Sequence, residues 1–356
     1  MMSSRSAVTP MPNHSNENSA LDDTLDKLDL PCRSVSTLAR ASAALIEADD
    51  LPPLPLPGQG ATLARWRVLA AIAGRDLSLV KIYESHTDAL AILAELRAPI
   101  QAATGRIWAV WAAEPPDAVL QAQREGDAVL TLTGTKAWCS GAAFVTDALV
   151  TCRDSQGEKW LAAVNLRQPG VRVTERGWHA VGMAATQSVE VEFDAVPAIP
   201  VGVSGEYLSR PGFWQGAVGI AACWYGAAAA LGNALRQAVV RREDPYRWAH
   251  LGTVDAALSS AAAVLRDAAE WIDHNPQGNA MILALRSRSV TETAVSTVLE
   301  ATGRALGATP FCRDRWFAQM SADLPVFVRQ SHAEHDLAAL GRLVARDHDD
   351  HDEWSL

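Results

Sequence analysis

Residues 132–140 read Leu-Thr-Gly-Thr-Lys-Ala-Trp-Cys-Ser and lie in a region whose apolar residues recur at every second position. In 130–133 leucine alternates with threonine, and in 189–193 valine and phenylalanine alternate with glutamate. A period of two is typical of antiparallel strands that bury one face. We therefore predict an antiparallel β domain over 104–200.

Helical periodicity flanks this β domain on both sides. Before it, apolar residues recur at helical spacing through 21–103, interrupted by a proline cluster at 52–60 that forces an extended loop. After it, three or four long helices are expected over 210–345. This order predicts an α+β fold with an N-terminal helical domain, a β domain and a C-terminal helical bundle. One C-terminal helix has a stripe of small residues that allows close approach of a flat ligand or, as we favour, of a neighbouring helix: Gly216, Gly219, Cys223, Gly226 and Ala230.

The two ends of the sequence differ from the rest in composition. Residues 1–20 are rich in Ser, Asn and Pro and lack the apolar core of a signal peptide, so we predict a disordered tail there. Residues 346–356 form an acidic tail, whose two histidines have no supporting residues that would make a metal site. We predict no metal site.

Charge and cysteine content exclude several classes of protein. The formal net charge of -10 leaves no broad positive field, which argues against a nucleic-acid partner. Five scattered cysteines indicate neither a disulfide framework nor a zinc site and fit a reducing cytoplasm. The longest apolar stretch, 217–235, is mostly Ala and Gly, so we predict a buried helix there and no membrane span.

Several short motifs resemble, in this order, those of the acyl-CoA dehydrogenase family. Residues 132–140 are similar to its Gly-x-Lys-x-Trp strand, and 111–115, which read Trp-Ala-Ala-Glu-Pro, are similar to its Thr-Glu-Pro turn. Residues 182–196 are similar to the segment that closes its β domain, and 302–307 to a glycine-rich signal of its C-terminal bundle. The resemblance covers about 38–341 and implies a protein that binds FAD.

The resemblance also implies which residues of this subunit hold the flavin. Trp138 would pack on one face of the ring, and Ser140 would place a hydroxyl at its rim. Trp111 and Ala113 would run along the ring edge through their backbone, although the family often has threonine at the position of Ala113. Residues 116–118 replace the family's Gly-Ser-Asp, which removes its usual contacts to pyrophosphate and CoA. The implied cofactor-binding residues here are Trp111, Ala113, Trp138, Cys139 and Ser140.

Further flavin contacts are implied from a neighbouring subunit, so the resemblance predicts a homodimer or a homotetramer. Arg241, Gly303 and Gly307 occupy the places of the family residues that reach across to the cofactor. Two departures affect the same region. Residues 244–245 read Asp-Pro where the family has Phe-Gly, and Ala322 replaces the arginine of an Arg-Asp pair.

The usual catalytic glutamate of the family is missing. Dehydrogenation needs a carboxylate within hydrogen-bond reach of the substrate's α-proton. One family position for it falls near Val328, and the other lies on the helix 212–231, which has no acidic residue. The nearest ionisable cluster is 332–336, His-Ala-Glu-His-Asp, which we place on the last helix. Within it, Glu334 is the candidate for a displaced base, and His335 is a second catalytic candidate.

Three functions stay open. The one we favour is an FAD-dependent oxidoreductase that oxidises the CH–CH bond of an acyl thioester by hydride transfer to the flavin. The second is a flavin-dependent monooxygenase of the same fold, because Arg329 and the pair 335–336 loosely resemble residues of such enzymes. Either would work with a flavin reductase or an electron-transfer flavoprotein. The third is a catalytically degenerate flavin-binding protein, suggested by Ala113, Pro116 and Ala322.

Overall fold

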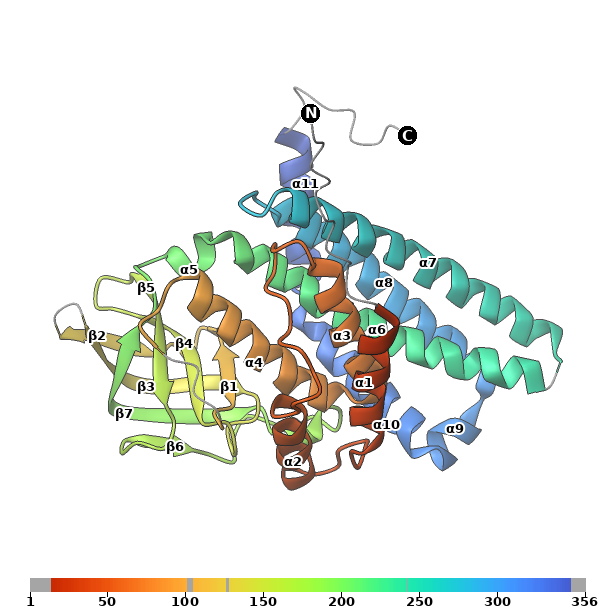
Figure 1. Cartoon of the computed structure of the whole chain (residues 1–356), viewed down its shortest axis with the longest axis horizontal. Coiled ribbons are helices and arrows are strands. Elements are labelled where there is room, and N and C mark those ends of the chain that lie inside the picture. Colours follow the sequence, from red (N-terminus) through yellow and green to blue (C-terminus); the bar gives the residue numbers. More distant parts are fainter. Residues whose placement is uncertain (1–13, 101–104, 126–127, 242, 347–356) are drawn as a thin grey trace, which may run out of the picture.

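The computed structural model describes residues 14–100, 105–125, 128–241 and 243–346. Figure 1 shows a helical N-terminal region, a sheet region beside it and a bundle of long helices that extends away from the sheet. The regions follow one another in the order that the change of hydrophobic period indicates. The predicted α+β fold class is therefore confirmed.

Four helices form the N-terminal region. They are α1 (His14–Asp26), α2 (Val35–Ile46), α3 (Thr62–Arg75) and α4 (Leu77–Glu95). Helix α1 begins at His14, inside the segment 1–20 for which a tail is predicted. Helix α4 begins after Asp76, whose carboxylate accepts a hydrogen bond from the Leu79 N–H at 2.7 Å, as a helix cap does.

The sheet closes on itself. Its strands are β1 (Trp108–Trp111), β2 (Gln121–Glu125), β3 (Val129–Cys139), β4 (Asp147–Arg153), β5 (Lys159–Asn165), β6 (Val171–Val173) and β7 (Val189–Pro200). The pairings run from β4 through β2, β3, β7 and β5 back to β4, with β1 beside β4 and β6 beside β7. Alternate residues such as Leu132, Val150 and Val191 fill the interior. The period of two thus marks the inner face of a small barrel.

Helix α4 fixes the helical region to the barrel. The backbone N–H of Trp108 donates to His86 Nδ1 at 3.1 Å, and that of Val110 donates to Ser85 Oγ at 2.8 Å. Burial lowers the pKa of His86 to about 4, so the imidazole is neutral and its Nδ1 can accept. These bonds hold α4 against β1, the strand that ends at Trp111.

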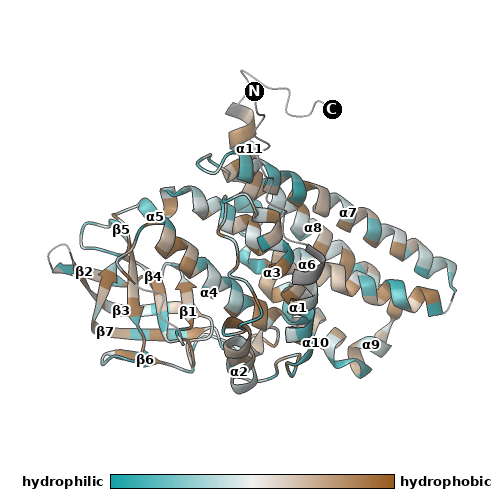
Figure 2. Ribbon diagram, in the orientation of Figure 1, coloured by the Kyte–Doolittle hydropathy of each residue, from teal (hydrophilic) through white to brown (hydrophobic). Residues whose placement is uncertain are grey.

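The C-terminal region is helical. Its elements are α5 (Glu206–Ser209), α6 (Pro211–Arg241), α7 (Pro245–His274), α8 (Met281–Leu306), α9 (Ala308–Arg313), α10 (Arg315–Phe327), the 3-10 turn η2 (Val328–Gln330) and α11 (Glu334–Arg346). A further 3-10 turn, η1 (Ala184–Thr186), precedes β7. Figure 2 shows hydrophilic residues along the outer helix α7, whereas α6 lies among the other helices. Asp244 caps α7 and Pro245 is its first residue, which gives the Asp-Pro pair a structural role.

Helix α6 is the central helix of the bundle. Its small-residue stripe packs against α3: a Cβ on Gly226 would collide with the Ala70 backbone, and one on Gly219 would touch the Trp66 indole at 3.5 Å. The preferred interpretation of the stripe, close helix packing, is confirmed. By length and composition α6 is apolar enough to span a membrane. However, 67% of its apolar 18-residue window is buried inside the protein.

Candidate functional site

Trp138 projects from the end of β3 instead of packing inside the barrel. Its φ of 56° is unusual for a residue with a side chain, and the register of β3 against β7 shifts between Lys136 and Cys139. Such a bulge re-aims side chains. The indole is 52% exposed, whereas Ala137 and Cys139 beside it are buried. A large flat apolar surface is therefore presented outside the sheet.

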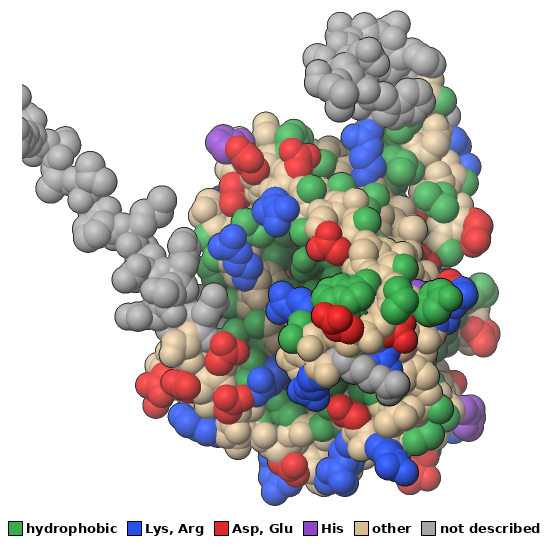
Figure 3. Space-filling model, turned by 90° about the vertical axis from the view of Figure 1, so that its right-hand side faces the viewer, with side chains coloured by type: hydrophobic (Ala, Val, Ile, Leu, Met, Phe, Trp, Pro, Cys, Tyr) green, Lys and Arg blue, Asp and Glu red, His purple; other side chains and the backbone are tan. Residues whose placement is uncertain are grey.

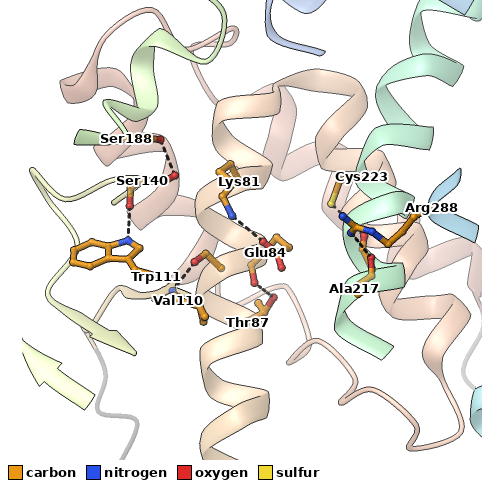
Figure 4. Close-up of polar contacts among 12 residues, drawn as sticks. Lys81, Glu84, Thr87, Val110, Trp111, Ser140, Ser188, Ala217, Cys223 and Arg288 are labelled. Carbon is orange, nitrogen blue, oxygen red and sulfur yellow. Dashed lines mark hydrogen bonds and ion pairs between the residues drawn. The ribbon is translucent and has the colours of Figure 1, made fainter. Parts of the chain in front are cut away.

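Ser140 begins a chain of hydroxyl groups next to this indole. Its Oγ lies 2.7 Å from Ser188 Oγ, which lies 2.9 Å from Thr186 Oγ1. The Trp111 indole N–H donates to the Ser140 carbonyl at 3.2 Å, as Figure 4 shows. Trp111 is thus bonded to Ser140, which follows Trp138 by two residues in the chain. The Cys139 side chain points into the barrel core, so only its backbone can face a ligand.

The turn after β1 is tied to β4 by two polar links. Glu114 accepts two hydrogen bonds from the Arg153 guanidinium, at 2.9 and 3.0 Å. The Thr151 hydroxyl donates to the Ala112 carbonyl at 3.1 Å and lies 2.7 Å from the Lys136 ammonium. These links hold Ala112 and Glu114, the two neighbours of Ala113, without a threonine side chain at 113.

Lys136 is expected to make the free energy of unfolding depend on pH. Its ammonium is buried and donates to the Thr151 carbonyl at 2.8 Å, and burial lowers its pKa to about 8. An unfolded lysine has a pKa of about 10.4, so between these values only the unfolded chain keeps the proton. We expect this lysine to add about 3 kcal/mol to the free energy of unfolding as pH rises from about 8 to 10.4. Denaturant titrations of wild type and Lys136→Met should differ by that slope, and parallel curves would contradict the assignment.

A cluster of buried charges, which the sequence motifs do not reveal, lies between the barrel and the bundle. Lys81 and Glu84 of α4 form an ion pair at 3.4 Å, and Glu84 is 5% exposed. Burial is the main cause that raises the pKa of Glu84. Figure 4 places this pair between Trp111 and Ser140 on one side and Cys223 of α6 on the other. The charge of Glu84 also raises the pKa of the Cys223 thiol, although burial raises it more.

Arg288 of α8 connects α6 to η2, the turn that precedes α11. Its guanidinium donates to the Ala217 carbonyl at 3.0 Å and to the Gln330 carbonyl at 2.8 Å, and it lies 4.7 Å from the Trp224 ring centre. Burial lowers the pKa of Arg288, while Asp336 and Glu84 both raise it. The segment that precedes α11 is therefore held beside the bundle by a buried cation.

The two catalytic candidates of that segment lie at the surface. Glu334 and His335 are both exposed, and α11 begins only at Glu334, so His332 precedes the helix, contrary to the prediction. Ligand atoms of His332, His335 and Asp336 lie within 4.8 Å of one another. Both histidines are exposed, and the Asp336 carboxylate accepts the His332 backbone N–H at 3.1 Å. The histidines of the acidic tail lie outside the described residues.

The residues expected to act on a neighbouring subunit lie far from Trp138. Arg241 ends α6, and Gly303 and Gly307 lie at the end of α8, which is the end of the bundle opposite the barrel (Figure 1). In Figure 3, which views this side, apolar side chains are exposed among charged ones. The large apolar residues exposed at this end are Val240, Tyr246, Trp248 and Phe311. Within one chain these groups and Trp138 do not meet.

A cavity of about 600 Å³ lies away from all of these residues. It is bounded by α1, α3, α6 and α10, with Asp26, Arg75 and Trp316 in its wall. Arg75 pairs with Asp26, and the Trp316 indole N–H donates to the Gly74 carbonyl at 3.2 Å. These three side chains are thus engaged with the protein itself, whereas Asn233 and Gln237 of α6 also line the cavity.

Comparisons with known proteins agree with this geometry. Residues 116–196 match the family described as "Acyl-CoA dehydrogenase, middle domain". The fold is similar to that of FMN-bound TdsC, a dibenzothiophene monooxygenase from Paenibacillus sp. A11-2, with 18% identity over 94% of this chain and 96% of that one and a TM-score of 0.73. No curated protein matches the sequence closely enough to show a relationship.

Two further solved structures share the fold. Methanesulfinate monooxygenase MsuC from Pseudomonas fluorescens has 16% identity over 95% of this chain and 97% of its own, with a TM-score of 0.71. A probable acyl-CoA dehydrogenase from Mycobacterium abscessus has 15% identity over 93% and 98%, with a TM-score of 0.75. The chain therefore has the fold of a class of proteins that includes flavin-binding ones. That fold is the acyl-CoA dehydrogenase fold, and the resemblance predicted from the motifs is confirmed.

Proposed function

We propose that the chain is a flavin-dependent monooxygenase that oxidises a small organic molecule. One observation carries this choice. The Trp138 indole offers an exposed flat face for a flavin ring. However, neither family position for the catalytic base holds a carboxylate, because Val328 is buried in η2 and α6 has no acidic residue. Glu334, the candidate for a displaced base, is exposed on α11. A reaction without α-proton removal therefore fits these residues better than the acyl thioester oxidation that the sequence favours.

The residues around Trp138 fit a flavin ring. The half-exposed indole offers a flat face, and the hydroxyls of Ser140 and Ser188 lie beside it as rim partners. The Ala112 carbonyl is held by the Thr151 hydroxyl and the Trp111 indole by the Ser140 carbonyl, which positions this segment for a ring edge. When bound, a flavin would supply the redox chemistry, taking electrons from a reductase and passing them to oxygen. The protein's own part is to orient the ring and to exclude water from it.

The names of two similar structures support the proposal. MsuC is a methanesulfinate monooxygenase, and TdsC is a dibenzothiophene monooxygenase that binds FMN. FMN lacks the adenine part of FAD, and the departures at 116–118, 244–245 and Ala322 all affect family contacts outside the ring. The proposal therefore concerns the ring that FMN and FAD share, and chromatography of the flavin released on denaturation identifies which one is bound.

We also propose a homodimer or a larger assembly of identical subunits. Arg241 and Gly303 can reach a flavin at Trp138 only from a second copy, because one chain places them at opposite ends. The apolar residues exposed near them, among them Tyr246 at 78%, would be covered by such contacts. Equilibrium sedimentation of the purified protein measures the subunit number.

Reaction with oxygen separates the two enzymatic candidates. The protein with bound flavin is reduced anaerobically with dithionite and then mixed with oxygenated buffer, and we expect the oxidised absorbance to return rapidly. Anaerobic addition of acyl-CoA thioesters, from short to long chains, should leave the oxidised spectrum unchanged. Bleaching by a thioester without oxygen would contradict the proposal and establish the dehydrogenase, for which the buried carboxylate Glu84 is the observation in favour.

A further inference from the structure

The carboxylate of Glu84 has fewer partners than a buried charge normally has. Among the residues that the structure describes, the only hydrogen-bond or ion-pair partner of this side chain is Lys81, and the 3.4 Å between them is long for a charged pair. Asp88, one turn further along α4, opposes the charged form of Glu84. Burial favours the neutral form of Glu84, but in either form its second oxygen has no hydrogen bond among the described residues, so a further partner is expected there.

The cations near Glu84 do not fill this role, because they are already engaged. The Arg65 guanidinium donates to the Pro55 carbonyl at 3.1 Å and to the Thr87 hydroxyl at 3.2 Å. Arg288 donates to two backbone carbonyls, as described above. Figure 4 shows Arg288 beside Cys223 and Ala217 of α6, on the side of Glu84 away from Trp111. Acceptor capacity is therefore left over at Glu84.

Other buried polar atoms without partners lie on the same elements. Four such side-chain atoms of the described residues belong to α6, α8 and η2: Trp224 Nε1, Ser287 Oγ, Thr291 Oγ1 and Gln330 Oε1. Arg288 connects these elements, since it contacts Trp224 and the Gln330 carbonyl. Buried groups of this kind are usually satisfied by water or by a ligand. Because Arg288 also interacts electrostatically with Glu84, these unpartnered groups belong to elements that Arg288 links to the surroundings of Glu84.

We propose that Glu84 binds the substrate by accepting a hydrogen bond from an N–H or O–H group, at a position between α4, α6 and α8. This deepens the proposed function by naming a substrate class, molecules with a hydrogen-bond donor at their buried end. An unsubstituted alkyl chain would cover the Glu84 carboxylate without replacing its lost hydration, so such chains are disfavoured. Glu84 is a binding residue in this proposal, whatever reaction follows.

Indole and benzofuran test the proposal as a matched pair, because they have the same size and shape but only indole carries an N–H. Calorimetric titration of the purified protein should show about 10- to 100-fold tighter binding of indole. In Glu84→Leu this preference should disappear, and in Glu84→Gln, which keeps an acceptor oxygen, a preference of less than 10-fold should remain. Equal binding of both compounds to wild type, or no binding of indole, would overturn the proposal.

Glu95→Gln is the control for a general loss of stability. Glu95 lies on the same helix, but its carboxylate already accepts from Arg210 at 2.6 Å and from the Gly212 N–H at 2.9 Å. We expect this variant to melt at a lower temperature and to keep the preference for indole. An unchanged preference in Glu84→Leu would show that Glu84 is structural. Repeating the titrations after flavin removal separates this result from the proposed function, since donor binding without oxygen reactivity would leave the Glu84 site standing.

Discussion

Replacing Trp138 with alanine is expected to weaken flavin binding roughly 100-fold. An aromatic side chain has about 150–250 Å² of surface, and 52% of Trp138 is exposed in the protein without ligand. Covering about 100 Å² of it contributes about 2–3 kcal/mol at about 25 cal/mol per Å², which corresponds to roughly 100-fold in the dissociation constant. Fluorescence titration of flavin-free protein with FMN and with FAD measures the change.

Two further variants control this experiment. Trp138→Phe keeps an aromatic face, so its dissociation constant for flavin should rise by less than about 10-fold. Ile199→Ala removes an apolar side chain from β7 of the same barrel with a similar exposure, 44%, and should leave flavin binding unchanged. Full flavin affinity in Trp138→Ala would mean that the ring, if bound, lies elsewhere, and the proposed monooxygenase site would fail with it.

The fold was predictable because its signals are local. A hydrophobic period of two over 189–193 marks a strand without knowledge of the partner strand, and the helical period before and after it is equally local. The outward direction of the Trp138 side chain cannot be predicted from its neighbours in sequence, because it depends on a bulge in the pairing of β3 with β7. The motif around Lys136 identified this residue where periodicity alone would have placed it in the core.

Hydrophobic periodicity does not predict the positions of Lys81 and Glu84. Lys81 and Glu84 stand in a helix that reads as amphipathic, and charged residues in such a helix are normally assigned to its solvent face. Glu84 is buried and Lys81 partly buried because α6, more than a hundred residues away in the sequence, packs on α4. The usable signal was the absence of a base elsewhere, which calls for a search of other buried carboxylates. Proximity in sequence to the family position favours Glu334 instead, which is exposed.

One departure from the family motif also becomes understandable. Ala322 replaces an arginine, but its neighbour Asp323 keeps a structural role, since its carboxylate accepts the Met183 N–H at 2.5 Å. Gly182 packs so closely on the Ala322 carbonyl that a side chain at 182 would collide with it. This contact joins α10 to the segment before β7, the join between bundle and barrel. The motif thus preserves the domain contact while losing one charge for the cofactor.

Replacing Gly226 with alanine should destabilise the protein by about 3 kcal/mol, near the upper end of the cost of overpacking a core. The added methyl group would collide with the backbone of Ala70, including its carbonyl oxygen, and not with a flexible side chain. Helices α3 and α6 would have to move apart, which loosens the core around Leu69 and Leu231. Thermal unfolding should show the melting temperature lowered by about 4 °C, because the unfolding entropy of a chain of 356 residues is about 0.75 kcal/mol per kelvin.

Gly252→Ala is the matched control, and its expected sign is opposite. Gly252 lies within α7, and a Cβ there would meet nothing within 4 Å, so the same substitution adds only helix propensity. It should stabilise the protein by about 1 kcal/mol, because glycine loses more backbone freedom in a helix than alanine does. If both variants changed stability equally, the close approach of α6 to α3 would be refuted. The enclosure of Glu84 by α6, which depends on that approach, would then lose its support.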